Sequence, residues 1–221
     1  MGQIKDIWPH DLLTFNNVKD FISDVNPLPD WAKDSLSKAK IVVVRRGKII
    51  NGKIPVGLRG YERNQRIGGY LAIDNIEKIY HVDYFIKHES WKKLAKERYM
   101  MPEFQALIKI KPYLKNYRWG ISGSLAYEMA TGVKMVKHTP EHNSDLDIIA
   151  INFPKISVEK AKEILKQLNQ FGTHADVQVV RGEAGFSLEE YANNRADTNL
   201  IKTATGPVLS KDPWQALRRF E

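Results

Sequence analysis

Apolar positions along the chain recur with two different periods, and the elements that they predict alternate between strands and helices. In residues 157–168 apolar side chains return every three or four positions, which is typical of an amphipathic helix. Short apolar runs at residues 41–44, 119–121, 145–149 and 175–180 have the composition of strands. The second half of the chain therefore predicts a β-α-β-α-β order, with a mixed sheet flanked by helices.

Further helices are expected from spacing, from prolines near helix starts and from a glycine at a helix end. The predicted helical segments are residues 17–23, 30–36, 74–98, 101–110, 125–131 and 214–220. In the segment 74–98, Ile76, Ile79, Val82 and Leu94 are predicted to face inward. Gly132 is expected to end the helix at 125–131.

The length of 221 residues and the 43% hydrophobic content indicate an α+β protein that buries its own core. We predict two domains with a boundary near residue 90. Residues 1–90 would form a smaller α/β domain for recognition, and residues 91–221 the catalytic domain. No internal repeat or low-complexity tract interrupts either part.

The sequence contains no cysteine, which excludes disulfides, thiolate metal sites and a cysteine nucleophile. The first eight residues lack the apolar run of a signal peptide, and no stretch approaches the length of a membrane span. We therefore expect a soluble, cytoplasmic protein without a membrane partner.

The net charge of +8 would suit an acidic or phosphate-rich partner. The basic residues are spread over both halves of the chain, without a dense basic tail or an arginine-rich helix. This distribution fits an acidic protein or a phosphate-rich small substrate at least as well as DNA or RNA, so a nucleic-acid partner is not expected.

Three carboxylates are the strongest candidates for chemistry. Asp145 and Asp147 are two residues apart in a strand-like run, so on an extended chain they project from one face, roughly 6.5–7 Å apart. A third, Asp176, lies in the strand-like run at 175–180. Because like charges so placed call for a cation and Mg²⁺ prefers hard oxygen ligands, all three are candidate Mg²⁺ ligands.

A Gly-Ser pair precedes the helix at 125–131. Gly123 lets the backbone come close to a ligand, and Ser124 opens a helix whose free N–H groups and positive dipole end suit a triphosphate. The plain alternatives are that Asp-x-Asp belongs to a surface loop and that Gly-Ser only caps a helix. Three carboxylates on strands beside such a turn are a rarer coincidence, which favours a nucleotide-transferring centre.

Four basic residues are candidate substrate contacts. Arg59 and Arg66 could bind phosphate oxygens through their guanidinium groups, although exposed arginines on polar turns are common. His10 is a candidate beside a proline, where most lone histidines are structural. Lys202, among apolar and small residues, could reach a leaving pyrophosphate or could be a surface lysine with a buried stem.

These motifs resemble those of the DNA polymerase β-like nucleotidyltransferase superfamily, with a longer interval between Ser124 and Asp145 because of an insertion at 134–143. Within it, the chain resembles the malonate decarboxylase holo-acyl carrier protein synthases, or phosphoribosyl-dephospho-CoA transferases. The matching stretches are residues 9–13, 54–60, 65–66, 123–126, 131–132, 144–147, 202–203 and 206–207.

The resemblance implies transfer of a phosphoribosyl-dephospho-CoA group from 2'-(5''-triphosphoribosyl)-3'-dephospho-CoA to a serine of the apo acyl carrier subunit of malonate decarboxylase, with release of pyrophosphate. Asp145 and Asp147 would hold Mg²⁺ on the phosphates, and Asp176 would bind a second ion or act as base. Gly123 and Ser124 would bind the triphosphate, and Lys202 or an N-terminal arginine would neutralise pyrophosphate.

Two other functions stay open from the sequence. The chain could be another transferase of the same superfamily, acting on a small molecule or an RNA end. It could also be a catalytically inactive nucleotide sensor. Likewise, residues 1–90 could recognise the dephospho-CoA portion or the carrier protein. They could instead only cover the apolar back of the catalytic sheet.

Overall fold

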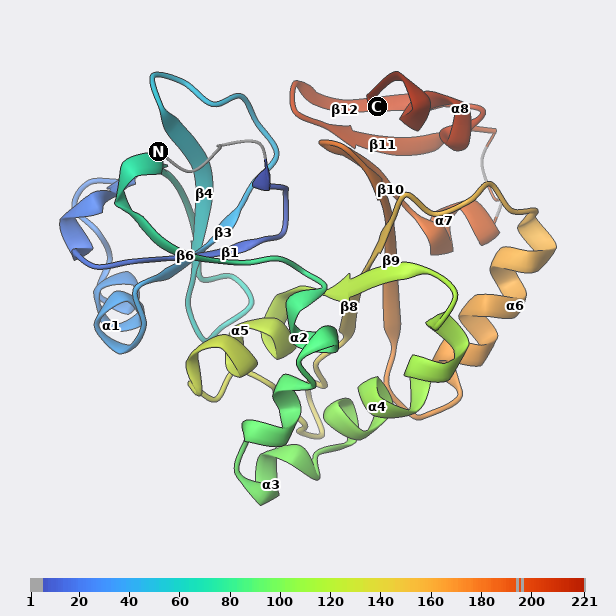
Figure 1. The fold of residues 1–221 in the computed structure, drawn as a ribbon, viewed down its shortest axis with the longest axis horizontal. Coiled ribbons are helices and arrows are strands. Elements are labelled where there is room, and N and C mark those ends of the chain that lie inside the picture. Colours follow the sequence, from blue (N-terminus) through green and yellow to red (C-terminus); the bar gives the residue numbers. More distant parts are fainter. Residues whose placement is uncertain (1–5, 194, 196, 221) are drawn as a thin grey trace. The chain divides into compact units, whose positions relative to one another are not determined.

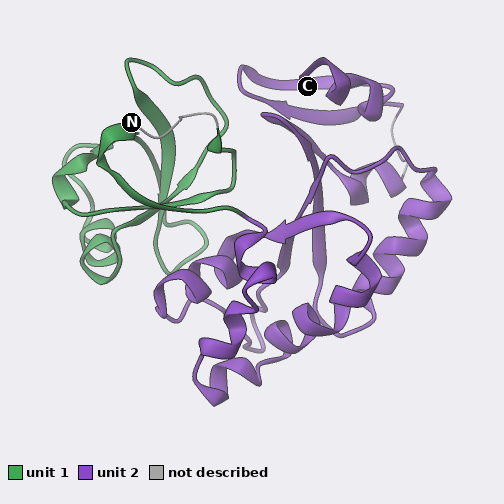
Figure 2. Ribbon diagram, in the orientation of Figure 1, with its two compact units in different colours: residues 1–81 green, residues 82–221 purple. Residues whose placement is uncertain are grey.

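The fold is mixed α+β, as predicted, and its two sheets belong to separate units (Figure 1). A computed structural model describes residues 6–193, 195 and 197–220; residues 1–5 of the N-terminal segment considered above lie outside that part. Unit 1 comprises Met1–His81 and unit 2 comprises Val82–Glu221 (Figure 2).

Unit 1 is a six-stranded antiparallel sheet with strand order β2-β5-β4-β3-β1-β6. Its elements are β1 (Leu12–Phe15), η2 (Val18–Asp20), β2 (Phe21–Ser23), α1 (Asp30–Lys38), β3 (Ile41–Val44), β4 (Lys53–Arg59), β5 (Arg66–Ala72), η3 (Ile73–Asn75) and β6 (Ile76–Tyr80). The predicted helix at 30–36 and the strand at 41–44 are confirmed by α1 and β3. Their apolar side chains join one buried cluster, in which Leu13, Leu36 and Val56 are fully buried.

Two helix predictions in this half of the chain are wrong in part. Residues 17–23 form the single turn η2 followed by strand β2. Within 74–98, residues 76–80 form strand β6, which pairs with β1 so that Ile79 lies opposite Leu13. The spacing of Ile76 and Ile79 resembles a helix, but hydrogen bonding to β1 gives this segment an extended backbone. Pairing between distant strands has overridden the local pattern.

Unit 2 contains the second sheet, with strand order β12-β11-β10-β9-β8-β7. Its elements are α2 (Tyr84–Lys87), η4 (Ser90–Lys93), α3 (Lys96–Tyr99), α4 (Pro102–Leu114), β7 (Arg118–Ile121), α5 (Gly123–Thr131), β8 (Leu146–Ile151), α6 (Val158–Asn169), β9 (Ala175–Arg181), β10 (Ala184–Ser187), α7 (Leu188–Asn193), β11 (Asn199–Thr203), β12 (Gly206–Ser210), α8 (Pro213–Leu217) and η5 (Arg218–Phe220). Strands β8 and β9 run parallel, and the other neighbours are antiparallel. The predicted β-α-β-α-β order corresponds to β7-α5-β8-α6-β9.

Local signals in the sequence account for the helices of this order. The backbone N–H of Lys160 donates to the Ser157 hydroxyl, which caps the start of α6, and Ala161, Ile164 and Leu168 form its buried face. Gly132 ends α5 in the left-handed conformation, at φ +72°, and its N–H donates to the Glu128 carbonyl over 2.8 Å.

The division between the units falls between His81 and Val82. The carbonyl of Val82 accepts a hydrogen bond from the N–H of Ile121 in β7 over 3.0 Å, and α2 packs against the same strand. Residues 82–90 therefore belong with the second sheet. Within the described residues, no helix is long and apolar enough to cross a membrane.

The segment that follows α5, where the insertion was predicted, is anchored to that helix by Glu128. The buried Glu128 carboxylate accepts from Nε and Nη2 of Arg98 over 2.6 and 2.7 Å. It also accepts from the backbone N–H groups of Met135 and Val136, each over 2.8 Å. One carboxylate thus joins α3, α5 and the following segment.

Candidate active site

Asp147 and Asp176 are brought together by the parallel pairing of β8 and β9. Each is the second residue of its strand, and the register places them directly opposite one another. Paired residues on neighbouring strands share a face and lie about 4.8 Å apart across the sheet. Both side chains are half-buried, whereas their neighbours Leu146 and Ala175 are buried. The two carboxylates therefore form a pair on the accessible face of the sheet.

Gly123 lies directly against this pair. It has φ +66°, a conformation that favours glycine, and a Cβ added there would stand 1.6 Å from Oδ2 of Asp147. The N–H of Ser122 donates to the Asp147 carbonyl over 2.8 Å. We expected Gly123 to admit a ligand; the structure adds a nearer reason for glycine, since the Asp147 carboxylate already occupies the space beside it.

Helix α5 begins beside the carboxylates, two residues before the predicted start at residue 125. Ser122 is its N-cap residue, Gly123 its first residue, and Ser124 is buried in its first turn. The first N–H groups of any α-helix have no acceptor within the helix, and the dipole makes this end positive. An N-terminus next to two carboxylates provides a place where phosphate oxygens and a cation could both be bound.

Asp145 lies just before β8 and contacts His174, which was not among the residues predicted from the sequence. Its Oδ1 is 3.5 Å from Nδ1 of His174, and Nε2 of His174 is 3.3 Å from Oε2 of Glu189. His174 precedes Asp176 by two residues, so strand alternation places it on the Asp176 face. That alternation was the available signal. Asp145 and His174 thus extend the row of polar side chains begun by Asp147 and Asp176.

The donor set fits a magnesium ion that also binds substrate. Among the described residues, no group of three or more His, Cys, Asp or Glu side chains is arranged to hold a metal ion by itself. Mg²⁺ is usually held by one or two carboxylates together with substrate phosphates and water. The half-buried pair Asp147 and Asp176 meets that requirement, because it leaves coordination positions open for substrate.

Lys202 is not brought to the carboxylates. It lies exposed on β11, opposite Gly185 of β10, which in turn lies opposite Val180 of β9. Val180 is four residues beyond Asp176, so the backbone of Lys202 is roughly 13 Å along and roughly 10 Å across the sheet from the carboxylates. The register therefore separates Lys202 from the proposed centre.

The remaining candidates, Arg59, Arg66 and His10, lie in unit 1. Arg59 and Arg66 are directly opposite each other on β4 and β5, so their side chains share one face; Arg66 is exposed and Arg59 half-buried. His10 has φ +79°, and its N–H donates to the carbonyl of Val44 over 3.0 Å. Two guanidinium groups opposed on one face favour an anionic partner, because like charges directly opposite destabilise a strand pair.

Comparison with known proteins finds relatives along almost the whole chain. Sequence profiles of the phosphoribosyl-dephospho-CoA transferase MdcG match in order, the N-terminal domain at residues 8–81 and the C-terminal domain at residues 93–213. A phosphoribosyl-dephospho-CoA transferase of Pseudomonas putida is 31% identical over 215 residues, covering 96% of this chain and 97% of the relative. One of Klebsiella pneumoniae (strain 342) is 30% identical over 93% of this chain and 95% of the relative. No solved structure matches the chain significantly.

The two sheets, flanked by helices, define a protein of the mixed α+β class. Within that class, the chain belongs to the phosphoribosyl-dephospho-CoA transferase family, whose two domain profiles together span most of its length. It is therefore a transferase.

Proposed function

We propose that this enzyme transfers the phosphoribosyl-dephospho-CoA group from 2'-(5''-triphosphoribosyl)-3'-dephospho-CoA to a serine of the apo acyl carrier subunit of malonate decarboxylase. The serine hydroxyl oxygen forms a bond to the α-phosphorus, the bond from that phosphorus to the diphosphate breaks, and pyrophosphate leaves. The observation that carries the proposal is the register of β8 and β9, which pairs Asp147 with Asp176 beside Gly123.

Each side chain of this centre would have its own role in the transfer. Asp147 would hold Mg²⁺ together with Asp145 or with its strand partner Asp176, and Asp176 would otherwise bind a second ion or act as the base that takes the serine proton. A bound Mg²⁺ would neutralise negative charge on the phosphates. The backbone at Gly123 and Ser124 would orient the triphosphate at the start of α5. Asp145 is positioned by its contact with His174.

Unit 1 would recognise the dephospho-CoA portion or the carrier protein. Arg59 and Arg66 share one face of the sheet, and paired guanidinium groups bind phosphate or carboxylate oxygens in a bidentate manner. A net charge of +8 would raise the rate of encounter with an acidic carrier in the cytoplasm. The alternative is that unit 1 has only a structural role and recognises neither the precursor nor the carrier.

Intact-mass spectrometry of the apo carrier subunit tests the proposal directly. After incubation with enzyme, Mg²⁺ and precursor, the carrier should gain the mass of one phosphoribosyl-dephospho-CoA group. Turnover of a nucleoside triphosphate without carrier would instead favour another transferase of the superfamily. Nucleotide binding without any turnover would favour a sensor.

The carboxylate pair is tested by Asp147→Asn. Loss of metal stabilisation worth several kcal/mol, at about 1.4 kcal/mol per tenfold change, lowers the transfer rate roughly a thousandfold or more. Asp74→Asn, which removes an exposed carboxylate in unit 1, is the matched control and should retain wild-type activity. Near-wild-type transfer by a folded Asp147→Asn enzyme would contradict the assignment.

The role of unit 1 is tested by Arg59→Ala and Arg66→Ala. Each should raise the KM for precursor or carrier, most clearly at low salt, because an attractive charge is lost. The melting temperature of Arg66→Ala should change little, since Arg66 is exposed. If steady-state kinetics are unchanged in both variants, unit 1 serves packing only.

A further inference from the structure

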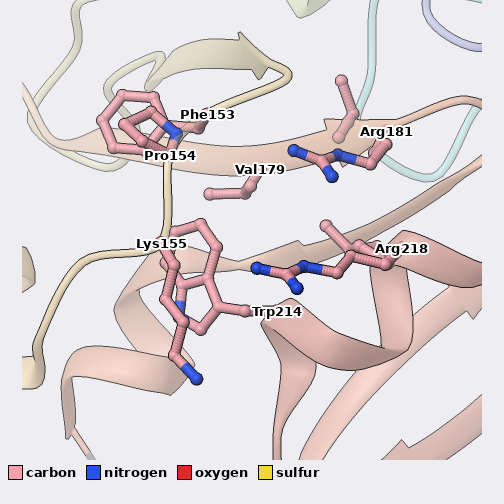
Figure 3. A pocket seen from close by; sticks show the side chains of 9 residues that line it. Phe153, Pro154, Lys155, Val179, Arg181, Trp214 and Arg218 are labelled. Atoms are coloured by element: carbon pink, nitrogen blue, oxygen red, sulfur yellow. The ribbon is translucent and has the colours of Figure 1, made fainter. Parts of the chain in front are cut away.

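Unit 2 contains a cavity at the opposite end of β8 and β9 from the carboxylates. It has a volume of about 220 Å³ and is lined by residues that follow β8, by the last residues of β9 and by α8 with its 3-10 extension (Figure 3). The residues that matter for its chemistry are Phe153, Lys155, Val179, Arg181, Trp214 and Arg218.

The cavity is separate from the proposed transfer centre. Asp176 is the second residue of β9 and Arg181 the last, so they are five residues apart, roughly 16 Å along the strand. Asp147 is likewise the second residue of β8, whereas the cavity begins beyond the end of that strand, at Phe153. The cavity thus lies at the carboxyl ends of two parallel strands, an edge where α/β sheets commonly bind ligands.

The polar side chains that line the cavity are cationic. Figure 3 shows the guanidinium groups of Arg181 and Arg218 extending in the same direction, with Val179 beside them. Arg218 is exposed and has no ion-pair partner among residues 6–193, 195 and 197–220. Lys155 is paired with Asp212 over 2.8 Å, and this hydrogen bond holds the pKa of Asp212 below its usual range. Arg218 therefore brings to the cavity a positive charge that no described acidic side chain neutralises.

The aromatic side chains that line the cavity already contact other aromatic rings of unit 2. Phe153 stacks on Tyr117 with ring centroids 4.3 Å apart, and Trp214 makes edge contacts with Phe186 and Tyr191 at 5.1 and 5.6 Å. The indole Nε1 of Trp214 is buried without an acceptor among the described atoms. A ligand would thus be recognised through its own oxygen atoms, which would accept hydrogen bonds from arginine, rather than by stacking of an aromatic base.

We propose that this cavity is a second binding site for a phosphate or diphosphate group. Arginine presents N–H donors in a planar fork that matches phosphate oxygens, and it offers no acceptor, so the ligand must supply acceptor atoms, and an oxyanion also matches the charge. The volume of about 220 Å³ is several times the roughly 30 Å³ that one water molecule occupies in the liquid, which leaves room for a phosphate or diphosphate group. The site does not depend on the proposed transfer reaction.

The site is tested by titrating the full-length protein, labelled with ¹⁵N, with inorganic pyrophosphate in EDTA at constant ionic strength. The chain has five tryptophans, and Trp214→Phe identifies the indole signal of the cavity wall. That signal should shift in a saturable way. EDTA removes divalent metal, so binding at the carboxylate pair does not interfere, and Asp147→Asn should bind pyrophosphate as the wild type does.

Arg218→Ala should raise the Kd for pyrophosphate roughly tenfold or more, as expected for loss of a charge-assisted hydrogen bond. Arg219→Ala removes the same charge from the neighbouring exposed residue, which does not line the cavity, and should leave the Kd nearly unchanged. Equal weakening by the two variants, or no saturable shift of the Trp214 signal, overturns the proposal.

A parallel titration with dephospho-CoA, which carries a diphosphate inside a larger molecule, identifies the source of the ligand. Tighter binding than pyrophosphate that is lost in Arg218→Ala would mean that the cavity holds the diphosphate of a bound coenzyme. Binding of pyrophosphate alone would mean that it takes the free anion. Both results support a phosphate site and differ only in its physiological ligand.

Discussion

Replacing Gly123 by alanine tests the closest contact in the proposed active site. The substitution has two costs. An alanine at φ +66° adopts the left-handed conformation, which costs about 1–2 kcal/mol. Its Cβ would also lie 1.6 Å from Oδ2 and 2.7 Å from Cγ of Asp147, so the carboxylate must move. Moving a side chain off its rotamer adds about 0.5–1.5 kcal/mol.

Gly132 provides a matched control at the other end of the same helix. Its φ of +72° is nearly the same, but an added Cβ would meet no atom within 4 Å. Gly132→Ala should therefore show the conformational cost alone, about 1–2 kcal/mol. Gly123→Ala should cost roughly 1 kcal/mol more and should also reduce the transfer rate, because Asp147 is displaced.

Urea denaturation of the two variants measures the difference in the free energy of unfolding. A double-mutant cycle then assigns its cause, since Asp147→Ala removes the atoms at 1.6 and 2.7 Å and leaves only a Cβ contact at 3.1 Å. In the Asp147→Ala background, Gly123→Ala should cost about as much as Gly132→Ala. If both glycine variants are equally destabilised with Asp147 present, the carboxylate does not lie against Gly123 and the site geometry is wrong.

Two further predictions concern stability in unit 2. Arg98→Leu should lower the free energy of unfolding, measured by chemical denaturation, by about 3–5 kcal/mol, because it leaves the buried Glu128 carboxylate without its cation. A loss under about 1 kcal/mol would contradict the ion pair between Arg98 and Glu128. A hydrogen bond from the Lys111 ammonium, and next one from that of Lys92, lowers the pKa of Glu89 to about 2. The stabilisation by ionised Glu89 is therefore complete above its ordinary pKa of about 4.5 and is lost as the pH falls toward 2. Glu89→Gln should therefore melt below the wild type at pH 7, with a difference that shrinks between about pH 4.5 and 2, whereas a difference independent of pH would contradict the assignment.

Local signals in the sequence were sufficient to predict several of the strands and helices that form the site. The alternation around Asp147 and Asp176, the apolar spacing of residues 157–168 and the helix end at Gly132 all depend on residues that are close together in the chain. Such signals act over short distances, so they can be read without knowing the fold. They predicted the β-α-β-α-β order. The motifs in these segments also carry the family resemblance that the profiles confirm.

Only the tertiary structure decided which of these elements meet. The pairing of Asp147 with Asp176 depends on the register of two strands separated by α6, and the same register separates Lys202 from them. Strand β6 has a helical spacing but pairs with β1, and Gly123 must be glycine because of a carboxylate on a different strand. Strand register is set by hydrogen bonds and burial between distant segments, so no local pattern contains it.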